Sequence, residues 1–202
     1  MKWKYFAYLT VFFLIVLACD KEDKRVDNFL VEFATVVKPA DKITFQLDNN
    51  KILIPKELKD YSGNNGQRVI LNYTPLRGDT VKVNNVSDIF TGTVQEISAV
   101  ADLVKDPVKI QSIWVGGNYL NMILEIEYYD KTHTIGLFRD TQSPTINLYF
   151  AHTKNDDPPG YVKKLSASFS LSSIKSVDGS PTPFRININT YSGVRVFELE
   201  VK

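Results

Sequence analysis

Residues 120–129 read LNMILEIEYY, and they decide the fold class because apolar and polar side chains alternate along them. Leu120, Met122 and Leu124 would face one side of an extended chain, while Asn121 and Glu125 would face the other. A period of two residues is typical of a β-strand with one buried face, whereas an amphipathic helix repeats every 3.6 residues. The segment therefore predicts an antiparallel sheet with one solvated face.

Similar segments fill the rest of the C-terminal half. Polar turn sequences separate them, such as NDDPPG at residues 155–160 and VDGSP at residues 177–181. This series of short alternating strands predicts an antiparallel β-sandwich over residues 108–202. Besides residues 120–129, strands are expected at residues 134–139, 146–152, 165–171, 184–191 and 194–201.

The N-terminal half also alternates, but its strands are more closely spaced. About five strands between residues 29 and 97 suit a small closed barrel. Pro55 could start a single helical turn over residues 55–60, and the irregular stretch at residues 98–107 predicts a linker. The expected fold is all-β, with a small barrel before a sandwich. Strands are expected at residues 43–47, 52–54, 66–74, 79–83 and 86–97.

The first 18 residues have the layout of a secretory signal. Lys2 and Lys4 precede an uncharged, mostly apolar run that ends at Ala18. The run is short for a membrane anchor, which needs about 20 apolar residues. VLAC, residues 16–19, resembles the lipobox of bacterial lipoproteins, which implies cleavage before Cys19 and lipid on its thiol. Residues 19–28 would then be a tether.

Cys19 is the only cysteine, so its alternatives matter. A catalytic thiol would need a histidine and a packed pocket, and an odd cysteine in an exported protein could form an intermolecular disulfide. The preceding apolar run favours lipidation. The next four residues, DKED (20–23), partly resemble the acidic export signal of Bacteroidetes lipoproteins, which implies an outer-membrane lipoprotein exposed on the cell surface.

Composition excludes one class of partner. Loss of Lys2 and Lys4 with the signal leaves 22 of the 24 basic residues against 23 acidic ones, a net charge of −1. Such a surface is not built to bind nucleic acid. With Cys19 lipidated, the folded body must depend on apolar burial rather than on disulfides.

Candidate catalytic or metal-binding groups are few. His133 and His152 are the two histidines, and they lack the spacing of a zinc pair. The best cluster is His152 with Asp156 and Asp157 at a strand end, although loops collect polar residues without any site. We find no nucleophile elbow, Walker loop or dinucleotide fingerprint, and GNNG (63–66) predicts only a turn.

Two further features could bind a sugar. Trp114 lies close to Gly116 and Gly117, and an aromatic ring there could stack on a glycan, but a core tryptophan beside a tight turn is the favoured interpretation. Alternating serines favour a solvated face, and nothing in the sequence selects a glycan for them. These serines are Ser166, Ser168 and Ser170.

The order of these segments resembles the NigD-like lipoproteins of Bacteroidales. The resemblance spans essentially the whole chain, and its most specific motifs are GQRVILNYTPL (66–76) and IWVGGNYLN (113–121). The other matching segments are the lipobox at Cys19, Asp106-Pro107, residues 152–157 and residues 168–171. The resemblance implies an N-terminal OB-type barrel, a C-terminal β-sandwich and a role in bacteriocin immunity. It brings no catalytic residues and no cofactor.

We therefore expect a non-enzymatic binding protein held at the membrane by lipid on Cys19, with a protein or peptide toxin as a possible partner. The alternative is a lipoprotein that binds a glycan or small ligand and works with an outer-membrane transporter. A hydrolase using His152, Asp156 and Asp157 is the third hypothesis. Neither a metal nor a cofactor is expected, and the sequence does not assign the ligand, the binding domain or the oligomeric state.

Overall fold

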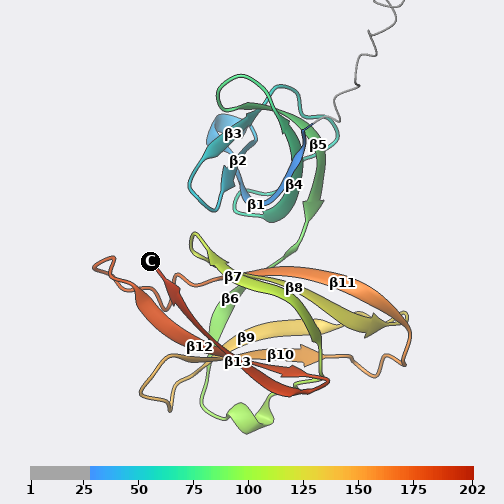
Figure 1. Cartoon of the computed structure of the whole chain (residues 1–202), viewed down its shortest axis with the longest axis vertical. Helices are drawn as coiled ribbons and strands as arrows, with labels where there is room; N and C mark the ends of the chain where they lie inside the picture. Colours follow the sequence, from blue (N-terminus) through green and yellow to red (C-terminus); the bar gives the residue numbers. More distant parts are fainter. Residues whose placement is uncertain (1–27) are drawn as a thin grey trace, which may run out of the picture.

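The computed structural model describes residues 28–202, which form two β-domains (Figure 1). The all-β prediction is confirmed. Within this part of the chain the only helical segments are two 3₁₀ turns, η1 (Pro39–Asp41) and η2 (Val100–Asp102). The helical turn expected at residues 55–60 is absent, since the chain leaves β3 (Ile52–Pro55) in an irregular conformation.

The predicted signal at residues 1–18 and the lipid site at Cys19 lie outside the described residues. Across residues 28–202, no helix has both the length and the apolar character needed to cross a bilayer.

The first domain is a closed five-stranded barrel in the order β1-β2-β3-β5-β4. It closes because β4 pairs with both β5 and β1, in each case antiparallel. Inward-facing residues such as Phe45, Leu53, Val69 and Leu71 fill its interior. Besides β3, its strands are β1 (Leu30–Val37), β2 (Thr44–Leu47), β4 (Arg68–Pro75) and β5 (Thr80–Asp88).

The second domain folds one eight-stranded sheet into two layers around a larger core (Figure 1). The strand order is β13-β12-β10-β9-β6-β11-β8-β7. The opening stretch forms β8, and Leu120, Met122 and Leu124 are fully buried, as the alternation predicts. The strands are β6 (Phe90–Ile97), β7 (Lys109–Gly116), β8 (Tyr119–Tyr128), β9 (Thr134–Asp140), β10 (Asn147–Thr153), β11 (Tyr161–Ser170), β12 (Thr182–Thr190) and β13 (Gly193–Val201).

Strand β6 forms the corner between the two layers. Its first half, residues 90–93, pairs with β11, and its second half, residues 94–97, pairs with β9. The barrel predicted over residues 29–97 is therefore too long, because β6 belongs to the second sheet. Both β6 pairings are parallel, as is β10 with β12, so the sheet is mixed rather than purely antiparallel. Parallel neighbours lie far apart in sequence, so no turn sequence between two adjacent strands indicates that they pair.

The stretch predicted as a linker at residues 98–107 is part of the sandwich. Lys105 bridges to His152 at the end of β10, and Val108 bridges to Thr190 at the end of β12. The Asn189 amide donates to the Lys105 carbonyl over 2.6 Å, and the Asp106 N–H donates to the His152 carbonyl over 2.9 Å. These contacts fix the segment between the ends of two strands, so it cannot act as a flexible connection.

Candidate functional site

Arg68 lies at the junction of the two domains. It opens β4, where Val69 and Leu71 take the inward positions, so the Arg68 side chain leaves the barrel on its outer face. That face should be solvated, yet Arg68 is 0% exposed because the sandwich covers it. An arginine remains charged at any ordinary pH, and burying an isolated charge costs several kcal/mol. The junction must therefore supply polar partners.

Both domains supply them. From the barrel, the Arg68 Nη1 contacts Asp48 Oδ1 at 2.8 Å and donates to Thr35 Oγ1 over 3.0 Å. From the sandwich, Asn121 Oδ1 accepts from Nη2 over 3.0 Å, and Ser168 Oγ accepts from Nε over 3.2 Å. The guanidinium thus binds β1 and the β2–β3 turn of the barrel and β8 and β11 of the sandwich at once.

The partners of Arg68 also bind each other and close the network. The Asn121 amide donates to Asp48 Oδ2 over 2.8 Å, and the Ser168 hydroxyl donates to Asn121 Oδ1 over 2.6 Å. The Arg68 Cζ lies 4.3 Å from the centroid of the Tyr119 ring, within the range of a cation–π contact. A buried charge with this many partners stabilises one relative position of the two domains.

The motif at residues 113–121 forms the sandwich side of this junction. Trp114 packs edge-on against Phe33 of the barrel, with ring centroids 4.9 Å apart. Gly117 has φ +56° in the β7–β8 turn, so the predicted tight turn is confirmed. A side chain at Gly116 would place Cβ 2.2 Å from Asp48 Oδ2. The glycine pair thus allows the turn to approach the barrel closely.

The expectations for Trp114 and the serines need correction. Trp114 is half-buried between the domains rather than inside the sandwich core. Ser168 is 0% exposed, so the serine row is not a uniformly solvated face, while Ser166 and Ser170 are half-buried. Strand alternation correctly assigned the three serines to the outer face, but it could not show that the barrel covers part of that face.

We predict that Arg68→Ala lowers the free energy of unfolding by about 3–5 kcal/mol, because it leaves Asp48 and Asn121 without their shared partner. Urea denaturation of the two proteins measures the difference. The matched control is Arg185→Ala, which breaks an exposed ion pair with Glu198 at 2.9 Å and should cost about 1 kcal/mol or less. Equal losses for the two variants would contradict the assigned role of Arg68.

The predicted histidine cluster exists, but with different members. His133 Nδ1 lies 2.9 Å from His152 Nε2, and His133 Nε2 lies 3.1 Å from Asp157 Oδ2. His152 Nδ1 lies 3.1 Å from the Asp106 carbonyl oxygen. Asp157 therefore reaches His152 only through His133. Asp156 is exposed and contributes its backbone carbonyl to Lys131, so it is not part of the cluster.

The contacts of the two rings restrict where ring protons can lie. The Asp106 carbonyl and the Asp157 carboxylate are acceptors, and in the contact between the two rings one nitrogen must donate and the other accept. A proton on both His133 Nδ1 and His152 Nε2 would put two N–H groups head to head across 2.9 Å.

The pKa shifts agree with a structural role. Burial lowers the pKa of His152, the nearby His133 lowers it further, and the Asp106 carbonyl only partly opposes this. Burial would raise the pKa of Asp157, but the backbone N–H groups of residues 129–131 and the His133 ring hold it well below its usual range. The cluster is buried, with His152 1% exposed, and it ties the 98–107 segment to two loops.

We predict that acid weakens this cluster. The pKa of His152 is lowered on folding, so its contribution to stability is complete above the ordinary histidine pKa of about 6.5 and is lost as pH falls below it. His152→Gln can keep both hydrogen bonds but cannot take up the extra proton. Between pH 7 and pH 5, the wild-type free energy of unfolding should fall more steeply than that of the variant, by at most about 1.4 kcal/mol per pH unit.

Urea denaturation across this pH range measures both slopes. Equal slopes in the two proteins would show that His152 does not titrate within the cluster.

No group of three or more His, Cys, Asp or Glu side chains that could hold a metal ion occurs within residues 28–202. The His152 and Asp157 side chains already bind protein groups, which leaves the predicted acid/base pair closed to a substrate. The sequence missed His133 as the central member because it comes from the loop before β9, and only the fold brings it to His152.

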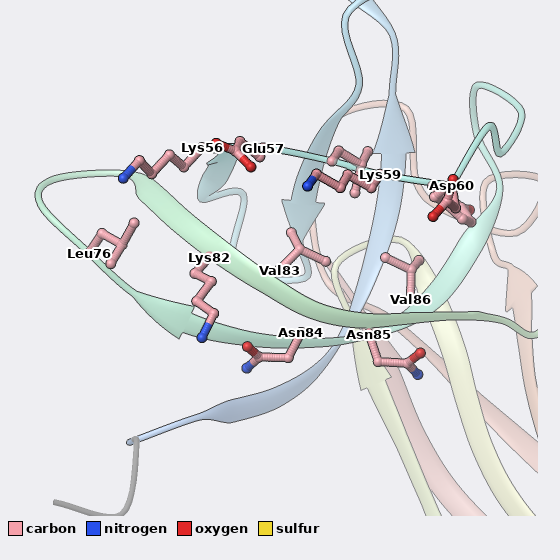
Figure 2. A pocket seen from close by; sticks show the side chains of 12 residues that line it. Lys56, Glu57, Lys59, Asp60, Leu76, Lys82, Val83, Asn84, Asn85 and Val86 are labelled. Carbon is pink, nitrogen blue, oxygen red and sulfur yellow. The ribbon is translucent and has the colours of Figure 1, made fainter.

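A concavity of about 650 Å³ lies on the barrel between the irregular segment after β3 and strand β5. Figure 2 shows Lys56 and Lys59 on one rim and Lys82 on the other, with Glu57 and Asp60 beside them. Leu58 and Val83 line it between the charges. Because both signs of charge alternate around its rim, the concavity does not select one class of ligand.

The family follows from a comparison with known proteins. Two family models match the sequence, the NigD-like N-terminal OB domain over residues 33–90 and the NigD-like C-terminal beta sandwich domain over residues 93–201. The chain belongs to the NigD-like family. The two matches meet at β6, where the topology also divides the barrel from the sandwich.

Solved structures of this fold come from Bacteroides and Parabacteroides species. A NigD-like immunity protein of Bacteroides caccae is 27% identical, with a TM-score of 0.67 over 84% of this chain and 90% of its own. A Parabacteroides distasonis protein labelled toxin-related is also 27% identical, with a TM-score of 0.77 over 86% of this chain and 93% of its own. Among curated protein sequences, none matches.

A third structure shows the fold alone. This protein of unknown function from Bacteroides vulgatus is 15% identical, with a TM-score of 0.74 over 86% of this chain and 91% of its own. The two-domain arrangement thus persists at low sequence identity.

Proposed function

We propose that this NigD-like chain is a lipid-anchored, extracytoplasmic binding protein that catalyses no reaction and protects its cell by binding a bacteriocin or another protein at the surface. The observation that carries the proposal is the likeness to the Bacteroides caccae immunity protein, which extends over both domains. An immunity protein acts by binding, so it needs a stable surface rather than reactive groups.

Two features of the molecule support binding over catalysis. The histidine cluster, which was the best catalytic candidate, uses its ring nitrogens to join loops of the sandwich. The Arg68 network holds the two domains against each other, and a surface that spans both then keeps its shape when a partner arrives. Preorganised surfaces bind more tightly because less conformational freedom is lost.

The proposed localisation rests on the N-terminal sequence. Residues 1–18 would direct export, Cys19 would carry the lipid, and residues 20–23 would favour the outer face of the outer membrane. Two or more lipid chains make release from a membrane negligible, which would keep the binding domains at the surface where a toxin arrives.

We predict that expression of the chain in a sensitive Bacteroides strain raises the inhibitory concentration of at least one bacteriocin from related strains. The variant Cys19→Ser should not incorporate a palmitate analogue, should accumulate as an unprocessed precursor and should give no protection. Growth inhibition across a bacteriocin panel measures protection, and lipid labelling measures anchoring.

Each arm has its own contradicting result. Unchanged sensitivity to every bacteriocin in a broad panel would contradict immunity. Continued labelling of Cys19→Ser would contradict the assigned lipid site, whatever the outcome of the bacteriocin assay.

A further inference from the structure

The outer faces of the two domains meet at one end and separate at the other. On the barrel, cross-strand pairs of β1 and β4 run from Thr35–Arg68 through Phe33–Ile70 to Val31–Asn72. On the sandwich, pairs of β8 and β11 run from Asn121–Ser168 through Ile123–Ser166 to Glu125–Lys164. The first pairs of the two series are joined because Arg68 of the barrel hydrogen-bonds to Asn121 and Ser168 of the sandwich. Residues of the later pairs line an open cavity of about 550 Å³, which we name the junction cleft.

Apolar residues form half of the lining of the junction cleft, and the polar half consists of Glu32, Asp48, Asn49, Lys164 and Ser166. Val31, Phe33 and Ile70 come from the barrel, and Trp114 and Ile123 come from the sandwich. Val31 is 54% exposed, so the apolar surface continues to the mouth of the cleft. A cleft between domains with apolar walls and a few polar groups is the usual form of a binding site.

The polar groups at the mouth restrict the ligand further. Lys164 is exposed, and Glu125, which lies opposite it on β8, is bound to Lys109 at 2.8 Å. Within residues 28–202 the Lys164 ammonium makes no ion pair, whereas the two carboxylates of the cleft are already bound, Asp48 by Arg68 and Glu32 by the Tyr73 hydroxyl. Lys164 therefore remains available to an external carboxylate. Beside it the Ser166 hydroxyl is the main hydrogen-bonding group on the sandwich wall.

We propose that the junction cleft receives an apolar side chain of a protein partner, flanked in that partner by a carboxylate that pairs with Lys164. This proposal rests on the proposed function and names its binding site. Asn49 and Ser166 beside Trp114 also offer hydrogen bonds and a stacking surface to a saccharide, so a glycan panel tests that competing occupant. An apolar anchor in a preformed pocket with a charge at the rim is the usual centre of a protein interface.

The Arg68 network makes this cleft permanent. Asp48 and Trp114 line the cleft and also take part in the junction, Asp48 through Arg68 and Trp114 through Phe33. The cleft therefore exists without its ligand and needs no opening step. Variants that test binding must leave these residues intact.

The test uses the full chain in detergent micelles and a phage-displayed library of random dodecapeptides as the probe. We expect selected peptides to carry an apolar residue next to Asp or Glu. Lys164→Glu should weaken their binding about tenfold or more, which corresponds to about 1.4 kcal/mol. Ile123→Arg, which fills the cleft from an outward position of β8, should abolish binding.

The matched control is Lys163→Glu, which makes the same charge change one residue away, on the opposite face of β11. It should change binding less than twofold. Circular dichroism checks that each variant is folded, and Lys164→Glu alters an exposed side chain, so it remains informative if Ile123→Arg fails to fold. Failure to enrich any peptide over empty micelles, or enriched peptides that bind Lys164→Glu as tightly as wild type, would overturn the proposal. So would a saccharide from a glycan panel whose binding Ile123→Arg removes.

Failure of the cleft and failure of immunity give different results. If wild type and Ile123→Arg protect cells equally from a bacteriocin, immunity stands and the cleft is not its site. If peptides bind the cleft as described but no bacteriocin is countered, the cleft stands and immunity is wrong.

Discussion

The buried guanidinium of Arg68 is the constraint on which the two-domain structure depends. The strand that carries it fills the barrel with Val69 and Leu71, and this forces Arg68 onto the outer face. Once the sandwich covers that face, the charge has no water and must be bound by protein groups. Asp48 and Thr35 of the barrel and Asn121 and Ser168 of the sandwich provide these groups.

The two most specific sequence motifs of the chain meet at this point. Residues 66–76 bring Arg68 on β4, and residues 113–121 bring Asn121, the tight turn at Gly117 and the aromatic contact of Trp114. Their residue types are explained by domain contact, since Gly116 admits Asp48 and Tyr119 covers the guanidinium. The same contact holds open the junction cleft, so binding and domain packing share one set of interactions.

Sequence predicted the elements that depend on local pattern and missed those that depend on distant pairing. Alternation placed β8 and its buried apolar residues correctly, because a half-buried strand repeats every two residues, but it left Asn121 facing water, and Asn121 is fully buried. It could not show that β6 turns the corner of the sandwich, since β6 pairs in parallel with β9 and β11. It also assigned Ser168 to the solvent, because the pattern distinguishes two faces of a strand but not what covers them.

The candidate sites were likewise predicted only as far as local sequence defines them. His152 and Asp157 do share a cluster, but His133 joins them from the loop between β8 and β9, and the adjacent Asp156 is exposed outside the cluster. Arg68 was present in a quoted motif, and its single signal was a charge at the start of an alternating strand. That signal is ambiguous, because an outward arginine on a barrel is ordinarily solvated.

Residual dipolar couplings of backbone amides test most directly whether the junction holds the two domains in one fixed relative orientation. We predict that a single alignment tensor fits the couplings of residues 30–88 and of residues 90–201 together. Two tensors of different magnitude or orientation would show that the domains move independently, and they would contradict the role given to Arg68.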